Sequence, residues 1–223
     1  INNHCYNQEV LDDTGYIYLT TTNKQVEQIN SQKLNQLDAE PAMFSADVSK
    51  SFKTTPPTDI ELYLKVGAQI MFLKNDPQGR WVNGTIGVIL EIDADHDELI
   101  VKCENNITVT VAKYTWTMYR YIYNSKSKVL ESESVGSFTQ FPLRLAWAVT
   151  IHKSQGKTFD NALIDLSRGT FSSGQAYVAL SRCRTLDGIR LSTPLRQNDI
   201  KLDPTIHDFF KAMTDLNISL DNP

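Results

Sequence analysis

The spacing of apolar residues changes twice along this chain of 223 residues, and that change constrains the fold more than any other feature. Residues 16–20 are rich in β-branched and aromatic side chains, as in a strand, and apolar side chains then recur at helical spacing. The helical positions are Val26, Ile29, Leu34 and Leu37. Thr22, with Gln25 three residues on, predicts a capped start for this helix. A strand, a short polar turn and a helix are typical of an α/β domain.

The middle of the chain has a different pattern, in which short apolar runs alternate with turn signals such as Asn83-Gly84. The runs that predict strands are 70–73, 85–92, 99–103, 107–111 and 116–123. Short strands at this spacing favour a small antiparallel β-barrel. We expect a connecting loop in front of it at 41–58, where Pro56-Pro57 interrupts any regular pattern.

The α/β pattern returns after Phe141. The predicted elements are a helix at 142–151 that begins at Pro142, a buried strand at 162–166, a helix at 172–182 that begins with a Ser172–Gln175 capping box, a strand at 189–191, and a last helix that Asp203 and Pro204 begin. The pattern therefore predicts an α/β fold, a parallel sheet with helices on both faces, interrupted by a small antiparallel β-barrel. The expected boundaries are 1–64 and 141–223 for the α/β domain and 65–140 for the insert.

Composition excludes several classes of protein. No apolar run approaches the roughly 20 residues of a membrane helix, so we expect no membrane partner. The three cysteines are far apart and form no Cys-x-x-Cys pair, which argues against a disulfide framework or a zinc site and indicates the reducing cytoplasm. The net charge is -4. Residues 141–196 nevertheless hold eight basic and three acidic side chains, a local excess that can attract phosphates.

Four segments carry a resemblance. They are 146–158 (Ala-Trp-Ala-Val-Thr-Ile-His-Lys-Ser-Gln-Gly-Lys-Thr), 174–184 (Gly-Gln-Ala-Tyr-Val-Ala-Leu-Ser-Arg-Cys-Arg), 19–30, and 66–71 with 83–87. In that order they resemble motifs V, VI and IV of superfamily-1 helicases of the RecD and PIF type, and the lead into that family's Src-homology-3-like barrel. The resemblance implies a second RecA-like domain, of the P-loop NTPase type, from the C-terminal part of an ATP-dependent 5′-to-3′ DNA helicase.

The resemblance also implies a nucleotide-facing side. Matched to motif VI, Arg182 is the expected catalytic residue, an arginine finger that reaches the γ-phosphate across a cleft between two domains. Gln155, Gly156 and Lys157 are expected near the same nucleotide, where glycine lets the backbone approach a ligand. The alternatives are a surface arginine in a salt bridge and a glycine that merely ends a helix.

A second group of residues is expected to contact DNA. Thr150, His152, Lys153 and Ser154 offer hydroxyl, imidazole and ammonium donors to phosphates. Asn23 lies at a predicted helix N-terminus, which suits an anion but equally suits an ordinary cap. The aromatic residues between Tyr114 and Tyr123 could stack bases, although alternating aromatics on a strand are more often core on one face and ordinary surface on the other.

One motif is missing. Gly156-Lys157-Thr158 ends like a phosphate-binding loop, but Ile151 stands where that loop needs its first glycine. The acidic pair that would hold Mg²⁺ is also absent from the sequence. We therefore expect ATP and Mg²⁺ to be held mainly by a missing N-terminal RecA-like domain, with single-stranded DNA as the other partner, and this chain alone to be inactive.

Two other functions fit the same residues. The chain could be a non-catalytic nucleic-acid binding module that keeps a RecA-like shell, or the helicase part of a conjugative relaxase-helicase. A phosphate-binding loop upstream in the gene would favour the enzyme, whereas an upstream tyrosine–histidine nuclease domain would indicate the relaxase.

Overall fold

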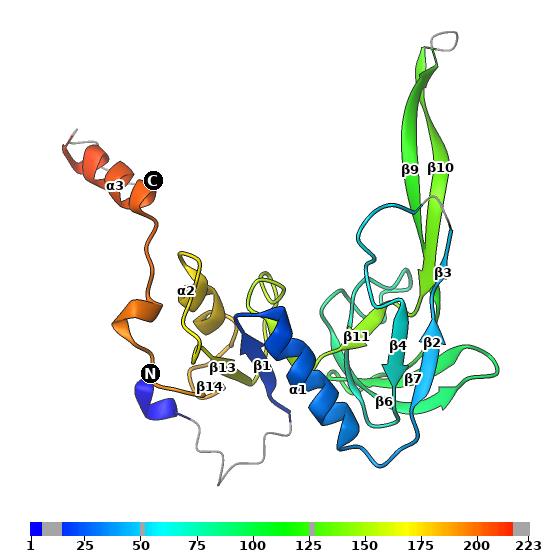
Figure 1. Ribbon diagram of the computed structural model, residues 1–223, viewed down its shortest axis with the longest axis horizontal. Coiled ribbons are helices and arrows are strands. Elements are labelled where there is room, and N and C mark those ends of the chain that lie inside the picture. The colour runs from blue at the N-terminus through cyan, green and yellow to red at the C-terminus, as the bar shows by residue number, and fades with distance from the viewer. Residues whose placement is uncertain (6–14, 50–51, 125–127, 216–223) are drawn as a thin grey trace. The chain divides into compact units, whose positions relative to one another are not determined.

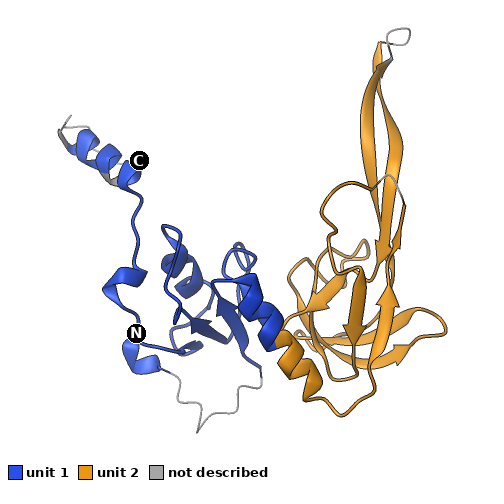
Figure 2. Cartoon of the chain, in the orientation of Figure 1, with its two compact units in different colours: residues 1–29, 148–223 blue, residues 30–147 orange. Residues whose placement is uncertain are grey.

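The computed structural model describes residues 1–5, 15–49, 52–124 and 128–215. The chain forms two compact units, which are residues 1–29 with 148–223 (unit 1) and residues 30–147 (unit 2) (Figure 2). Unit 2 therefore interrupts the sequence of unit 1. The domain boundaries predicted after residues 64 and 140 stay predictions.

Unit 1 is built on a parallel sheet. Its strands, in spatial order, are β12 (Ala148–Thr150), β1 (Ile17–Thr20), β13 (Ala162–Asp165) and β14 (Ile189–Leu191) (Figure 1). Every neighbouring pair is parallel. Nearly all residues of these strands are buried, as expected of a parallel sheet that is covered on both faces. The predicted α/β class with a parallel sheet is confirmed.

Two of the three described helices, α1 (Asn23–Asn35) and α3 (Pro204–Asp215), begin where the sequence predicts caps. The third is α2 (Gln175–Leu180), and 3-10 turns form at η1 (Asn2–His4) and η2 (Gln197–Asp199). The Gln25 amide donates to Thr22 Oγ1 at 3.4 Å, and the Thr205 amide donates to Asp203 Oδ1 at 2.9 Å. No helix among the described residues is long and apolar enough to cross a membrane.

The predicted helix at 142–151 is wrong. Two strands occupy the segment, β11 (Leu143–Leu145) and β12, and residues 151–156 form turns. Strand β12 pairs with β1 of the parallel sheet, and its residues are buried throughout. A short apolar run buried on both faces has the same appearance in a sequence as one face of a helix, so pairing with β1 decided the outcome.

In its described residues, unit 2 is antiparallel and all-β apart from the end of α1. A five-stranded sheet has the order β11, β5 (Gln69–Phe72), β6 (Ile86–Asp93), β7 (Glu98–Cys103) and β8 (Thr108–Ala112). The remaining strands are β2 (Ala42–Ser45) with β4 (Glu61–Leu64), and β3 (Asp47–Val48) with β10 (Val129–Gln140) and β9 (Tyr114–Asn124). The predicted loop at 41–58 is wrong in part, because β2 and β3 lie within it. Phe44 of β2 is buried against Phe141, and this packing holds the segment in place.

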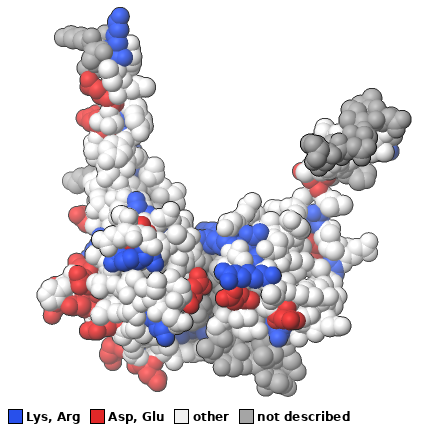
Figure 3. Space-filling model, turned by 180° about the vertical axis from the view of Figure 1, so that it is seen from behind, with Lys and Arg blue, Asp and Glu red and all other residues white. Residues whose placement is uncertain are grey.

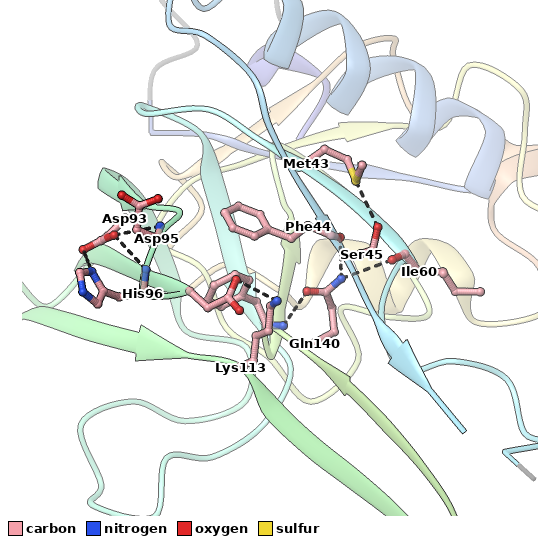
Figure 4. Close-up of polar contacts among 11 residues, drawn as sticks. Met43, Phe44, Ser45, Ile60, Asp93, Asp95, His96, Lys113 and Gln140 are labelled. Atoms are coloured by element: carbon pink, nitrogen blue, oxygen red, sulfur yellow. Dashed lines mark hydrogen bonds and ion pairs between the residues drawn. The ribbon is translucent and has the colours of Figure 1, made fainter. Parts of the chain in front are cut away.

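A buried glutamine holds the sheets of unit 2 together (Figure 4). Gln140, at the end of β10, is fully buried. Its Nε2 donates to the carbonyl oxygens of Phe44, at 2.8 Å, and Ile60, at 3.4 Å. Its Oε1 accepts from the Phe141 amide at 3.0 Å. Both the nitrogen and the oxygen of the Gln140 side-chain amide therefore have hydrogen-bond partners, so its burial does not leave a polar group unsatisfied.

Candidate functional site

Several predicted site residues meet at one edge of the parallel sheet. Thr20, the last residue of β1, is in register with both Thr150 of β12 and Asp165 of β13. The Ile151 amide then donates to the Thr20 carbonyl at 2.9 Å. Because parallel strands end at the same edge, Asn23 and the turn after β12 leave the sheet there together. In open α/β sheets this carboxyl edge is the usual place for ligands.

A hydrogen-bonded network fixes the start of α1 to this edge. Gln25 is buried, and its Nε2 donates to Asp165 Oδ2 at 3.0 Å. Asp165 Oδ1 accepts from Ser192 Oγ at 2.7 Å and from the Ser167 amide at 2.9 Å. Asn23 lies exposed in the first turn of the helix that this network anchors. Gln25 and Asp165 were not predicted as site residues, although an acidic residue near the end of a buried strand was a signal.

The turn after β12 separates the predicted DNA contacts into two groups. His152 and Lys153 are exposed, as a role at a ligand requires. Ser154 is fully buried, and its hydroxyl donates to the Ile151 carbonyl at 2.7 Å. The predicted contact between Ser154 and DNA is therefore wrong in this structure. Thr150 is also buried, and its Oγ1 accepts from the Lys153 amide at 3.4 Å, so it shapes the turn.

The residues predicted to face a nucleotide are brought together by backbone pairing. The Phe159 amide donates to the Arg182 carbonyl at 2.8 Å, and a parallel β-bridge joins Phe159 to Cys183. The turn of Gln155, Gly156 and Lys157 thus lies beside the segment that follows α2. Gly156 has φ +77°, and a Cβ at this position would meet no atom within 4 Å. Its positive φ, rather than a close neighbour, explains the glycine.

Arg182 is half-buried and held by neutral acceptors. Its Nε donates to the Val178 carbonyl and its Nη1 to the Lys157 carbonyl, both at 2.9 Å, while Nη2 donates to Ser181 Oγ at 2.8 Å. None of the carboxylates among the described residues forms an ion pair with it. These bonds orient the guanidinium without neutralising its charge, and one N–H on each terminal nitrogen is left for a further acceptor.

The position of Arg182 relative to helix α2 differs from the predicted one. Helix α2 ends at Leu180, so Arg182 follows the helix instead of lying within it. The predicted Ser172–Gln175 capping box is also wrong, because Gly174 precedes the helix and no side chain caps it. Gln175 Oε1 instead accepts from the Phe171 amide at 3.0 Å. A local pattern could not anticipate this, because the competing donor lies in the loop before the helix.

The aromatic strand β9 divides along its length. Near the body of unit 2, Trp116 packs against Phe138 at 5.8 Å between ring centroids. Further out, where β9 and β10 extend as a hairpin (Figure 1), Tyr119, Tyr121 and Tyr123 are exposed. These three tyrosines fall on one face of the strand. The packing of Trp116 agrees with the alternative that these aromatic residues belong to the core on one face of the strand. Base stacking by the exposed tyrosines stays a prediction.

One face of the molecule shows how its charged side chains are distributed. In the face drawn in Figure 3, each unit carries lysine and arginine side chains in small patches, and acidic side chains lie on the same face. This fits the net charge of -4.

Comparison with known proteins gives a consistent result. No family model matches the chain. It is 37% identical over 196 residues to the ATP-dependent DNA helicase Pif1 of Bdellovibrio bacteriovorus, covering 85% of this chain and 42% of that protein. It is 33% identical over 213 residues to human ATP-dependent DNA helicase PIF1, covering 92% of this chain and 31% of that protein. The chain therefore spans less than half the length of these curated relatives.

Solved structures agree with the sequence relatives. A crystal structure of Bacteroides sp. Pif1 in complex with ADP-AlF4 superposes with a TM-score of 0.82 and 35% identity, over 97% of this chain and 49% of that one. A crystal structure of Bacteroides Pif1 bound to ssDNA has a TM-score of 0.75 and 36% identity, over 94% of this chain and 48% of that one. The similarity thus covers both units of this chain and about half of each Pif1 structure.

Proposed function

The chain is a homologue of the Pif1-family superfamily-1 DNA helicases, over the region of one RecA-like domain, and from this premise we propose that it supplies the arginine finger and part of the DNA track of an ATP-dependent 5′-to-3′ DNA helicase. ATP is the proposed substrate, bound between this domain and a second RecA-like domain. The direction of movement comes from the resemblance alone.

The observation that carries the proposal is the environment of Arg182. Backbone carbonyls and a hydroxyl hold the guanidinium in one orientation, and its charge has no carboxylate partner among the described residues. A phosphate oxygen would accept the N–H groups that these bonds leave over. An arginine presented in this way to a γ-phosphate stabilises the charge that develops during phosphoryl transfer. Gln155, Gly156 and Lys157 would border the same nucleotide.

Single-stranded DNA is the proposed second ligand, at the carboxyl edge of the parallel sheet. The N-terminus of α1, with Asn23 exposed, offers backbone N–H groups to a phosphate, and Lys153 offers an ammonium group. Relatives solved in complex with ADP-AlF4 and bound to ssDNA support both ligand classes. Mg²⁺ would be held by the second domain. The described residues contain no group of three His, Cys, Asp or Glu side chains that could hold a metal ion.

The proposal is tested by DNA-stimulated ATP hydrolysis in the full-length protein. Arg182→Ala should lower kcat about 10³-fold or more and leave the Kd for single-stranded DNA within about 2-fold. Arg184→Ala is the matched control, because Arg184 lies two residues on, its side chain is 68% exposed, and among the described residues its ion pair is with the exposed Asp160. Control turnover should match the wild type. A wild-type protein that binds DNA without any stimulated hydrolysis would instead indicate the non-catalytic module.

A further inference from the structure

An exposed phenylalanine lies at the proposed DNA-binding edge and has no role in the site described so far. Phe171, in the loop between β13 and α2, is 60% exposed. Its ring centroid lies 5.7 Å from that of His152, with 34° between the ring planes. His152 is itself exposed, on the turn after β12. The segments that follow two strands of the parallel sheet, β12 and β13, therefore present a pair of aromatic rings.

The backbone around Phe171 is held firmly although its ring lies in solvent. The Phe171 amide donates to Oε1 of the buried Gln175 at 3.0 Å. The preceding residue, Thr170, is buried, and its Oγ1 donates to the Asp199 carbonyl at 3.0 Å. The Lys201 ammonium donates to the Thr170 carbonyl. An apolar ring in water forgoes the gain of burial, so a rigid mount that keeps it there is typical of a binding anchor.

Gln175 has one unusual feature. Its Oε1 accepts from the Phe171 amide, but its Nε2 is buried with no acceptor among the described residues. Buried polar atoms without a partner are rare in folded proteins, and each one needs an explanation. Maintaining the position of Phe171 for a ligand is a sufficient explanation.

We propose that Phe171 and His152 form a stacking step that holds one nucleobase of single-stranded DNA at the carboxyl edge of the parallel sheet. The inference rests on the proposed function, because it takes DNA as the ligand of this edge. Every base has an apolar face that stacks on an aromatic ring, so the step needs no particular sequence. Lys153, beside His152, and the N-terminus of α1 would take the neighbouring phosphates.

The separation of the two rings determines how the base binds. A base inserted between them would need ring centroids roughly 7 Å apart, twice the 3.4 Å spacing of stacked bases. The observed 5.7 Å is shorter, so the base extends the stack on the outer face of Phe171. His152 then supports Phe171 from behind through its ring, which differs from the phosphate contact expected from the sequence.

The test compares intact and abasic oligonucleotides in binding to the full-length protein. Fluorescence anisotropy measures the Kd for an oligo-dT, and for a set in which one abasic nucleotide is moved along the strand. Phe171→Ala should weaken oligo-dT binding about 5- to 100-fold, the range of one base–aromatic stack. Phe171→Trp should bind within about 2-fold of wild type. At one abasic position the wild type should bind more weakly than it binds intact oligo-dT, by the same factor. At that position Phe171→Ala should bind the abasic oligonucleotide as well as it binds intact oligo-dT.

Two further variants separate stacking from a structural effect. Phe171→Leu keeps an apolar side chain and should fold, yet should bind oligo-dT as weakly as Phe171→Ala. Tyr177→Ala removes another exposed aromatic residue, 75% exposed on α2, and should leave the Kd unchanged. Equal affinities of wild type and Phe171→Leu, or the same loss on every abasic oligonucleotide, would overturn the stacking step alone. A wild-type protein that binds no single-stranded DNA would overturn the proposed function with it.

Discussion

Nη1 of Arg182 lies 2.9 Å from the carbonyl oxygen of Lys157, and this bond joins two segments that are 25 residues apart in the sequence. Lys157 ends the turn proposed to border the nucleotide, and Arg182 is the proposed finger. A displacement of that turn would therefore either break this bond or move the guanidinium. The bond gives a physical route by which the turn after β12, at the proposed DNA edge, could influence the position of the finger.

Ser181 is expected to position Arg182. Its Oγ accepts from Arg182 Nη2 at 2.8 Å and donates to the Val178 carbonyl at 3.0 Å. Ser181→Ala removes one orienting hydrogen bond, typically worth about 1 kcal/mol, so kcat of DNA-stimulated ATP hydrolysis should fall roughly 5-fold. The KM for ATP and the Kd for DNA should not change. Ser181→Thr, which keeps the hydroxyl, should restore kcat, and an unchanged kcat in Ser181→Ala would contradict the assignment.

Asn23 offers a test in which stability and DNA binding change differently. A carboxylate in the first turn of α1 suits the helix dipole, so Asn23→Asp should leave the thermal midpoint unchanged or raise it slightly. The same charge should repel a DNA phosphate and weaken binding by about 3- to 10-fold, more than Asn23→Ala does. Anisotropy at two salt concentrations measures this. Asn35→Asp, at the exposed C-terminal end of α1, is the matched control and should not affect the Kd.

The ion pair between Asp76 and Arg80 predicts that unit 2 loses stability in acid. The Arg80 guanidinium, which bonds to both carboxylate oxygens at 2.8 Å, lowers the pKa of Asp76 from 3.8 to about 2. Because the folded pKa is the lower one, the stabilisation is complete above pH 4 and is lost as the pH falls towards 2.

We expect urea unfolding to show a loss of about 1 kcal/mol across that range, a value reduced for the partly exposed Arg80. Asp76→Asn should lack this component of the pH dependence, while Asp95→Asn, at an exposed aspartate, should keep it. Parallel stability curves for wild type and Asp76→Asn would rule the explanation out.

Gly188 is expected to be intolerant of any side chain. A Cβ there would lie 2.0 Å from the Asp160 carbonyl oxygen, where only backbone movement could relieve the clash. That movement would disturb the bond from the Ala162 amide to the Gly188 carbonyl, at the start of β13. Gly188→Ala should lower the free energy of unfolding by about 3 kcal/mol, as measured by thermal or urea unfolding. Asp187→Ala, at the exposed neighbouring residue, is the control and should have the free energy of unfolding of the wild type. A Gly188→Ala variant as stable as the wild type would show that the close approach is unimportant.

Predictions from the sequence were confirmed where a segment's own pattern decides its structure. Strand β1, the start of α1 and the start of α3 follow from spacing and caps that involve residues close in sequence. The segment 142–151 failed, because its apolar residues suit a helix face and a buried strand equally well. Strand β10 was not predicted, since its first half is exposed on both faces and shows no alternation.

By itself the sequence determined the class of the fold, the order of its parts and the chemical groups available, because propensity, turn residues and residue types act over a few positions. It identified Arg182, His152 and Lys153 as candidates. Only the tertiary structure decided that Ser154 points inward, that Arg182 meets the Lys157 carbonyl and that Phe171 lies beside His152. These contacts depend on how parallel strands far apart in the chain align at one edge, which no local pattern encodes.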